Sequence, residues 1–298
     1  MHRCWPVLIV MASAWPVWAD DSSPGVKRAL LVCGHPGDDD HAKLFGETFA
    51  KIHHGLTETL GFPEEYISAF FGVKPGDAAL PGVAVQSPGS REAIAKAIAQ
   101  LRNELRPQDT LWVIVMGHAH FDGRHAFLNL PGPDMHQDDF GGLFRDLACR
   151  EQVFLITTPA SGYFIKPLSA PGRIVITATE ADLEVNETLF PHALADEVNP
   201  TAEKPLNDAD QDGLLTIFDF YIAVTKNVAQ RYIREELIAT EHALLDDNGD
   251  GRGSELQLDY LTEEEGGRRR RNFQPSHKAG ADGSLAVTIR FPKEPRTK

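Results

Sequence analysis

Residues 111–122 read LWVIVMGHAHFD and residues 153–162 read VFLITTPASG, and these two stretches decide the fold. Each begins with an apolar run of strand length and ends in a cluster of Gly, Ser, Thr or His. Apolar runs of this kind are typical of strands buried on both faces of a parallel sheet. In open α/β sheets, ligands bind just beyond the carboxyl ends of such strands. We therefore expect the functional site where the two runs end, at His118 on one loop and residues 157–161 on the other.

The first two hundred residues alternate strand and helix patterns. Besides the two opening stretches, a short hairpin is expected to end near residue 132. The alternation predicts an α/β fold, with a mostly parallel sheet, right-handed crossovers and helices on both faces. The predicted strands are residues 28–33, 66–71, 111–116, 153–158 and 173–179, and the predicted helices are residues 42–60, 91–105 and 137–149.

The first 19 residues have the pattern of a secretory signal peptide. A short polar start is followed by an apolar stretch and by a small-x-small cleavage site at Val17 and Ala19. We expect the mature protein to begin at Asp20 and to be secreted or periplasmic. No later stretch approaches the ~20 apolar residues of a membrane-spanning helix, so no membrane span is expected.

A change in composition after Val198, toward Asn, Pro, Thr and Asp, predicts a domain boundary. In the last segment, residues 284–291 (SLAVTIRF) alternate like an edge strand. The expected organisation is a signal peptide at 1–19, the α/β domain at 20–198, a calcium-binding region at 199–261 and a tail at 262–298.

The chain is acidic, with 29 Lys and Arg against 43 Asp and Glu and a formal net charge of −14. This balance argues against nucleic acid or an anionic membrane as a partner. Outside the signal segment two cysteines remain, Cys33 and Cys149. An exported protein could pair them, and two buried free thiols are the alternative.

The two opening stretches, in this order and spacing, resemble the signature segments of legumain-type cysteine peptidases and of the related GPI transamidase catalytic subunit. The resemblance covers roughly residues 28–197 and implies a caspase-like fold. It also places the family's catalytic histidine on His118, although the glycine that follows it in the family is Ala119 here. The family's nucleophilic cysteine falls on Pro159, because the Ser-Gly pair that closes the motif matches the SG of the second stretch.

The chain resembles more closely a set of bacterial secreted proteins of this fold in which the cysteine position is commonly Ser. Their segments run like GHGTFDGR and NTTSASG, and calcium-loop repeats follow the domain. Asp122-Gly123-Arg124 and the run NLPGPD at residues 129–134 fit that set. The resemblance therefore implies a calcium-binding region behind the α/β domain.

Pro159 has neither a nucleophilic atom nor a backbone N–H, so the family mechanism cannot run at this position. The expected function is that of a pseudo-peptidase that acts by binding a protein or peptide ligand. The alternative is a hydrolase in which His118 activates Ser161 or Thr158. Against it, hydroxyls in tight turns commonly bond backbone groups. A transition-metal site at His118, His120 and Asp122 is a further option, although three ligands on one short loop rarely converge.

Residues 208–219 match the EF-hand loop position by position. Such a loop has acidic residues at positions 1, 3 and 5, Gly at 6 and a carboxylate at 12, because Ca²⁺ takes about six to eight oxygen ligands. The aspartate at position 12 is shorter than the usual glutamate. The expected Ca²⁺ ligands of this first aspartate loop are Asp208, Asp210, Asp212, Leu214 through its carbonyl, Thr216 and Asp219.

A second aspartate loop starts at Asp246 and fits the EF-hand pattern at positions 1, 3, 5 and 6, while position 12 is Gln257. An ordinary Asx/Gly turn is the alternative. The two loops are joined by residues 217–245, which begin with apolar residues at helical spacing, so the pair resembles an EF-hand or dockerin-like unit. A dockerin-like interaction module is therefore a third candidate function. The expected Ca²⁺ ligands of the second loop are Asp246, Asn248, Asp250, Arg252 through its carbonyl and Glu255.

Overall fold

The computed structural model describes residues 24–73, 80, 82–85, 87–147, 149–182, 184–268 and 280–291. The signal segment at 1–19 lies outside the described residues. Two sheets form in the described part, one of seven strands in the order β10-β9-β8-β4-β1-β2-β3 and one of three in the order β5-β6-β7. The strands are β1 (Lys27–Cys33), β2 (Ile67–Phe71), β3 (Ser87–Pro88), β4 (Thr110–Met116), β5 (Ala119–Phe121), β6 (Ala126–Leu128), β7 (Met135–His136), β8 (Glu151–Ile156), β9 (Arg173–Thr177) and β10 (Leu244–Asp246).

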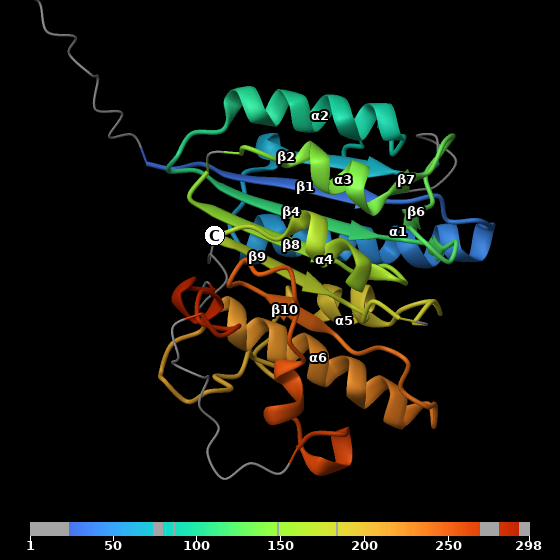
Figure 1. Ribbon diagram of the computed structural model, residues 1–298. Coiled ribbons are helices and arrows are strands. Elements are labelled where there is room, and N and C mark those ends of the chain that lie inside the picture. Colours follow the sequence, from blue (N-terminus) through green and yellow to red (C-terminus); the bar gives the residue numbers. More distant parts are fainter. Residues whose placement is uncertain are drawn as a thin grey trace, which may run out of the picture.

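Every neighbouring pair in the large sheet is parallel except β9 and β10, which are antiparallel. Helices cover both faces, with α2, α3 and α4 on one and α1, α5 and α6 on the other (Figure 1). This arrangement confirms the predicted α/β class with a mostly parallel sheet. The helices are α1 (Asp39–His54), α2 (Arg91–Glu104), α3 (Gln137–Leu143), α4 (Ile165–Leu168), α5 (Phe190–Glu197) and α6 (Ile217–Arg234).

The strands alternate their side chains between two apolar cores. On β1, Leu31 and Cys33 enter the core beneath α1, α5 and α6, while Leu30 and Val32 enter the core beneath α2 and α3. Because both faces are buried, these strands are apolar throughout, which is the pattern that the sequence displays.

The segment after residue 198 belongs to the same core as the α/β domain. α6 packs its apolar face into that core beside Trp112 of β4, and β10 extends the sheet itself. The boundary expected near residue 198 therefore has no counterpart in the packing.

Three elements differ from their predicted extent. Helix α3 ends at Leu143 rather than near residue 149, because Gly141 and Gly142 weaken its last turn and Asp146 takes a positive φ of 61°. The helix expected over residues 217–245 ends at Arg234. The tail at residues 284–291 is not an edge strand: it forms a 3₁₀ turn at Ala286–Thr288 and a single bridge between Arg290 and Thr216.

Candidate functional site

The strand order reverses between β1 and β4, and the loops that leave these two strands meet there. Gly34 donates its N–H to the Met116 carbonyl at 3.0 Å, so the loops stay in contact beyond the sheet. Gly117, with a φ of 110°, passes so close that an added Cβ would lie 2.9 Å from the Gly34 nitrogen. Such a topological switch point is where open α/β sheets form their ligand crevices.

His118 stands at this point, half-buried against α1. Its Nε2 lies 2.9 Å from the Pro36 carbonyl, which can only accept, so Nε2 carries the proton and Nδ1 is the atom able to take one. The ring makes edge contacts with the rings of His41 and Phe45 at centroid separations of 4.9 and 5.1 Å. This histidine is thus held in place by a carbonyl and two rings.

His41 is a neighbour that the sequence reasoning missed. Its ring lies between two carboxylates, 2.7 Å from Asp38 and 3.1 Å from Glu187. The hydrogen bond to Asp38 raises the pKa of His41 above its ordinary value. The only sequence signal for it was the acidic run directly before it, in which Asp38 is the N-cap of α1 and accepts the His41 N–H.

The second strand end presents no accessible nucleophile. Ser161 is fully buried, and its Oγ accepts hydrogen bonds from the backbone N–H groups of Ala178 and Thr179, both at 3.0 Å. Pro159 is buried and Thr158 is fully buried, and the Thr158 hydroxyl has no hydrogen-bond partner in the described part of the chain. The Ser161 oxygen is therefore engaged with backbone N–H groups of the loop after β9.

The two cysteines are both buried free thiols, so the pairing that was considered does not form. Burial raises the pKa of each, that of Cys149 to about 11. Neither thiol is therefore suited to act as a nucleophile, since the thiolate is the reactive form.

The alternative metal group of His118, His120 and Asp122 is not brought together. His120 bonds Asn129 through Nδ1 at 2.6 Å, and the Asp122 carboxylate accepts from the backbone N–H groups of the turn that follows it. The three side chains are engaged with three different partners: the Pro36 carbonyl, Asn129 and the backbone of the turn at residues 124–125.

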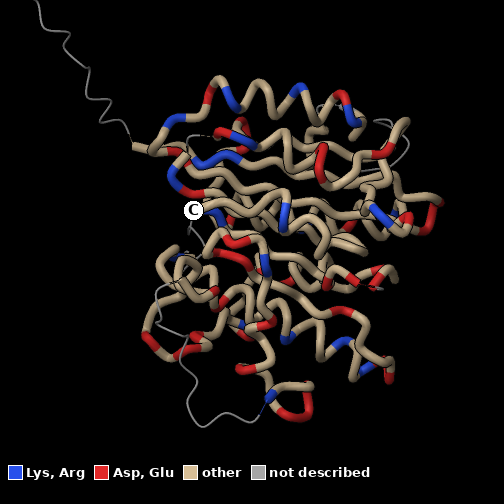
Figure 2. The backbone as a smooth tube through the Cα atoms, in the orientation of Figure 1, with Lys and Arg blue, Asp and Glu red and all other residues tan. Residues whose placement is uncertain are grey.

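The first aspartate loop lies at the amino end of α6, where acidic residues colour the tube red (Figure 2). Carboxylate oxygens of Asp208, Asp210 and Asp212 all lie within 4.8 Å of one another. Asp208 also accepts the N–H groups of Asp212 and Gly213 at 3.1 and 2.8 Å, which curls the backbone around its carboxylate. Burial and then the nearby carboxylates of Asp219 and Asp212 raise the pKa of Asp210 to about 6.

The remaining expected ligands of the first loop have other contacts. Asp219 caps α6: its carboxylate accepts from the N–H and the hydroxyl of Thr216 and from the Ala209 N–H. Thr216 is the N-cap of that helix, and Leu214 is exposed. The structure thus brings together three of the six expected ligands, with Asp219 close behind them.

The second aspartate loop is less complete. Asp246 is fully buried, and one of its carboxylate oxygens has no hydrogen-bond partner among the described residues. Asn248 and Asp250 each accept a backbone N–H two residues on, from Asp250 and Arg252 at 2.8 Å. Gln257, at position 12, accepts instead from the Tyr221 hydroxyl. The loop also follows a sheet strand, β10, so the two loops do not form the helix–loop–helix pair that a dockerin-like unit requires.

Glu255, expected as a ligand of that loop, is directed to a cluster at the carboxyl end of β9. A hydrogen bond with Glu255, followed by burial, raises the pKa of Glu180 to about 7. Beside them His242 bonds Glu184, which raises the pKa of His242 to about 9. Burial opposes ionisation of Glu184, but the bonds from His242 and from backbone N–H groups lower the pKa of Glu184 on balance.

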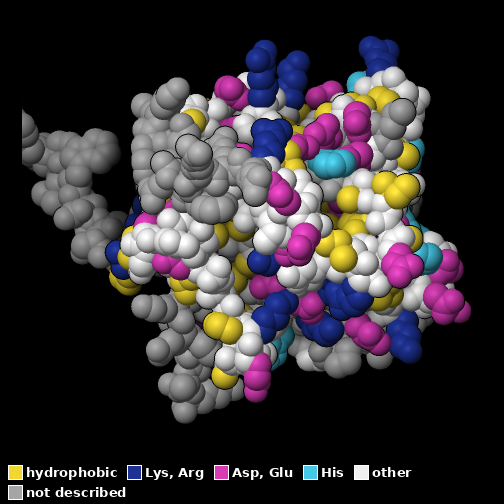
Figure 3. Space-filling model, turned by 90° about the horizontal axis from the view of Figure 1, so that it is seen from below, with side chains coloured by type: hydrophobic (Ala, Val, Ile, Leu, Met, Phe, Trp, Pro, Cys, Tyr) yellow, Lys and Arg dark blue, Asp and Glu magenta, His cyan; other side chains and the backbone are white. Residues whose placement is uncertain are grey.

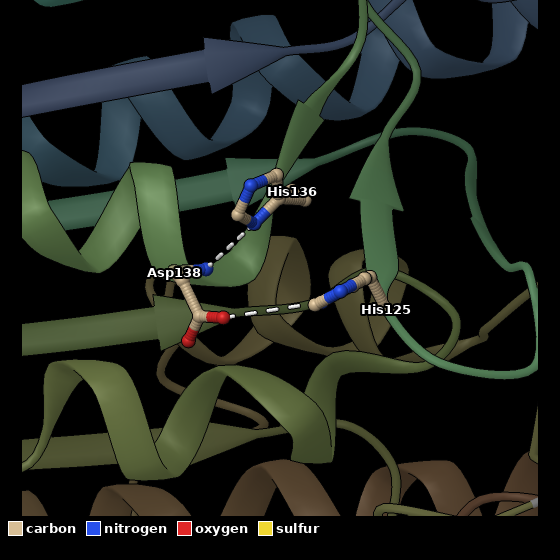
Figure 4. A group of neighbouring side chains, drawn as sticks. All are labelled: His125, His136 and Asp138. Carbon is tan, nitrogen blue, oxygen red and sulfur yellow. Dashed lines mark hydrogen bonds and ion pairs between the residues drawn. The ribbon is translucent and has the colours of Figure 1, made fainter.

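One further cluster joins His125, His136 and Asp138, on the three-stranded sheet and the first turn of α3 (Figure 4). Nδ1 of His125 lies 3.9 Å from the Asp138 carboxylate, and Nδ1 of His136 accepts the Asp138 backbone N–H at 3.2 Å. The sequence offered no spacing signal for this group, because its members come together through the pairing of β6 with β7.

Comparison with known proteins gives one finding. No protein-family model matches the chain, and no curated protein matches it. Among solved structures it is similar to the Drosophila initiator caspase Dronc, with 10% sequence identity and a TM-score of 0.45, over 75% of this chain and 79% of that one. A likeness at this level concerns the fold alone and carries nothing about activity. Among the described residues no helix is both long enough and apolar enough to cross a membrane.

Proposed function

We propose that this protein is an exported, calcium-binding relative of the legumain-type peptidases that acts by binding a protein or peptide ligand rather than by cleaving it. The observation that carries the proposal is the state of the second strand end. The resemblance to the legumain-type peptidases places Pro159 at the position of the nucleophile. The nearby Ser161 is fully buried, with its oxygen bonded to two backbone N–H groups. A hydroxyl acts as a nucleophile only when it meets both its base and the substrate.

The first aspartate loop supports the calcium part of the proposal. Asp208, Asp210 and Asp212 would supply carboxylate oxygens to the ion, and Leu214 its carbonyl. Three carboxylates within 4.8 Å of one another repel, and a divalent cation bound among them relieves that repulsion. Calcium would therefore hold the residues that precede α6 in the conformation that starts this helix.

The calcium proposal is tested by the melting temperature with and without the ion. A ligand that binds only the folded state adds RT ln(1 + [L]/Kd), about 2.7 kcal/mol at a hundredfold excess over Kd. We expect a chelator to lower the melting temperature of the wild type, and Asp208→Ala with Asp212→Ala to remove that response. The matched control, Glu64→Ala with Glu65→Ala, removes two exposed carboxylates elsewhere and should keep the response. A wild type that melts identically with calcium and with chelator would contradict the proposal.

The absence of peptidase activity is tested by turnover of a diverse peptide library in the presence of calcium. We expect no cleavage by the wild type. Cleavage that disappears in His118→Ala and in Ser161→Ala would establish the hydrolase instead. Cleavage by Pro159→Cys alone would show that the histidine and the rest of the site remain competent.

One observation favours a specific version of the hydrolase. The Thr158 hydroxyl is buried without a hydrogen-bond partner among the described residues, and such a group costs about 1–3 kcal/mol. A role in the site would account for its retention. Thr158→Val, which keeps the shape, should abolish any activity if Thr158 is the nucleophile and should stabilise the fold if it is not.

A further inference from the structure

A hollow of about 730 Å³ opens on the side of the molecule that carries α3 and α4. Its walls come from segments far apart in the sequence: the β5–β6 turn, the start and end of α3, α4, β10 and the second aspartate loop. The floor is apolar or glycine-rich, with Tyr163, Ile165 and Leu244 among the residues that form it. A volume of this size is that of a site for a small molecule rather than for a single ion.

The lining of this hollow is basic, although the chain as a whole is acidic. Four cations line it, Arg124, Arg145, Lys166 and Arg252, and among the described residues of its lining only Asp138 carries a carboxylate. None of the four forms an ion pair with any carboxylate in the described part of the chain. Arg28, by contrast, forms an ion pair with Glu104 at 2.8 Å. Elsewhere, as on the face in Figure 3, acidic and basic side chains are mixed.

Such an arrangement is unfavourable without a ligand, because like charges that surround one concavity repel one another. In a protein with a net charge of −14, four cations that have no ion pair among the described residues and surround one hollow point to an anionic ligand. Since the acidic molecule as a whole repels extended polyanions, that ligand has to be small enough to enter the hollow.

The histidines at its edge support an anion and not a metal. The Gln137 side-chain oxygen accepts the Ala126 N–H at 2.8 Å, so its nitrogen is the donor to Nδ1 of His125 at 3.2 Å. Nδ1 of His136 likewise accepts a backbone N–H (Figure 4). Both neutral rings therefore carry their proton on Nε2, and a metal would have to break one of these bonds at each ring. His125, which lines the hollow, instead offers an N–H donor.

Three of the four cations are arginines, whose guanidinium groups match the oxygens of a phosphate in pairs. A phosphomonoester carries close to two negative charges near neutral pH, against one for a carboxylate. The hollow is also much larger than a free phosphate ion, and its apolar floor can cover an organic group. We propose that this hollow binds a small organic phosphomonoester, with the phosphate held by Arg124, Arg145, Lys166 and Arg252 and the organic part against Tyr163. The site is separate from His118 and from the first aspartate loop.

The test is titration calorimetry with phenyl phosphate on the full chain. We expect one site per chain and an affinity that falls as salt is raised. Arg145→Gln with Arg252→Gln removes two exposed cations that line the hollow, and should weaken binding by about tenfold or more. The control Arg234→Gln removes an exposed cation at the end of α6, outside the hollow, and should leave the affinity unchanged. An unchanged melting temperature shows that each variant is folded.

Two further probes test the separate contributions of the phosphate group and of the organic group to binding. Benzoate has the same ring with a single negative charge and should bind at least about tenfold more weakly. Inorganic phosphate should also bind more weakly than the ester, because it leaves the floor uncovered. Failure of phenyl phosphate to bind at millimolar concentration would overturn the proposal. So would equal affinities in wild type and double variant, benzoate binding as tightly as phenyl phosphate, or inorganic phosphate binding more tightly than the ester.

Discussion

Glu241 → Gln should flatten the dependence of the protein's stability on pH. The carboxyl of Glu241 is buried beneath the amino end of α5, where it accepts the N–H groups of Leu189 and Phe190 at 2.6 and 3.0 Å and the Tyr232 hydroxyl at 2.8 Å. Burial raises the pKa of Glu241 to about 7 from an ordinary value of 4.5, despite these three hydrogen bonds. The folded state therefore holds this proton more tightly than the unfolded state does.

The sign and the size of the effect follow from that difference. Between pH 4.5 and 7 the folded state binds more protons, so the free energy of unfolding is highest below this window and falls as the pH rises through it. With pKa values of about 7 folded and 4.5 unfolded, Glu241 alone should remove about 2–3 kcal/mol between pH 5 and pH 8. Glutamine cannot ionise, so the variant should lack this contribution, whatever its stability at any one pH.

The assay is urea unfolding at a series of pH values from 5 to 8, with the wild-type curve subtracted from that of each variant. The subtraction removes the contributions of other titrating groups, His242 among them. Glu235→Gln, at an exposed position after α6, serves as the matched control and should run parallel to the wild type. If the Glu241→Gln curve also runs parallel to the wild type, the carboxylate is not held protonated by its surroundings and the reasoning fails.

Three further outcomes are expected. Gly162→Ala should destabilise the fold by at least about 2 kcal/mol, because its Cβ would lie 2.3 Å from the Glu180 carbonyl carbon. The control Gly142→Ala meets no atom within 4 Å and should be neutral or mildly stabilising. Equal urea midpoints for the two variants would contradict this expectation. Asp247→Ala deprives three backbone N–H groups of residues 283–286 of their acceptor and should cost roughly 2–4 kcal/mol, with faster hydrogen exchange at those amides as the local readout. N-terminal sequencing of exported protein should begin at Asp20, and a start well inside the mature chain would refute the cleavage site.

The apolar strands were the most predictable part of the fold. Runs such as residues 111–116 are buried on both faces, so every position requires an apolar side chain. The pattern can therefore be recognised without knowing which strand or helix packs beside it. Helix α2 was equally clear, since Ile94, Ile98 and Leu101 recur on one face and Ser90 caps its start. In these segments local sequence and tertiary packing demand the same residues.

Elements whose contacts come from residues far away in the sequence were not predictable. Strand β10 has three residues and no periodicity, and it forms because the open edge of β9 accepts it. The tail alternates like a strand, yet Asp247 ties its backbone into turns through three hydrogen bonds. A short segment adopts the structure that its strongest tertiary contact favours. That contact comes from residues distant in the sequence, so no local window contains it.

The two strand ends were predictable as loops, and the contacts made there were less so. The two strand ends do carry His118 and Ser161, but the donors that satisfy Ser161 come from the loop after β9. In the first aspartate loop, carboxylate oxygens of Asp208, Asp210 and Asp212 lie within 4.8 Å of one another. Asp219 was read as a ligand because of its position in a motif, and the same position is also the third residue of a helix, where a carboxylate closes a capping box.

The antiparallel strand β10 has a consequence for how the chain is made. The parallel strands are complete once residue 177 has been synthesised, but the outer side of β9 stays uncovered until Leu244–Asp246 arrives. During that interval a row of backbone N–H and C=O groups is available to any other strand, which is the usual starting point of aggregation. A chain released after residue 198 would keep this exposed edge permanently. By supplying β10, the last third of the sequence covers the edge of β9 that would otherwise favour self-association. The second aspartate loop directly follows β10, so its conformation bears on how firmly β10 stays paired with β9.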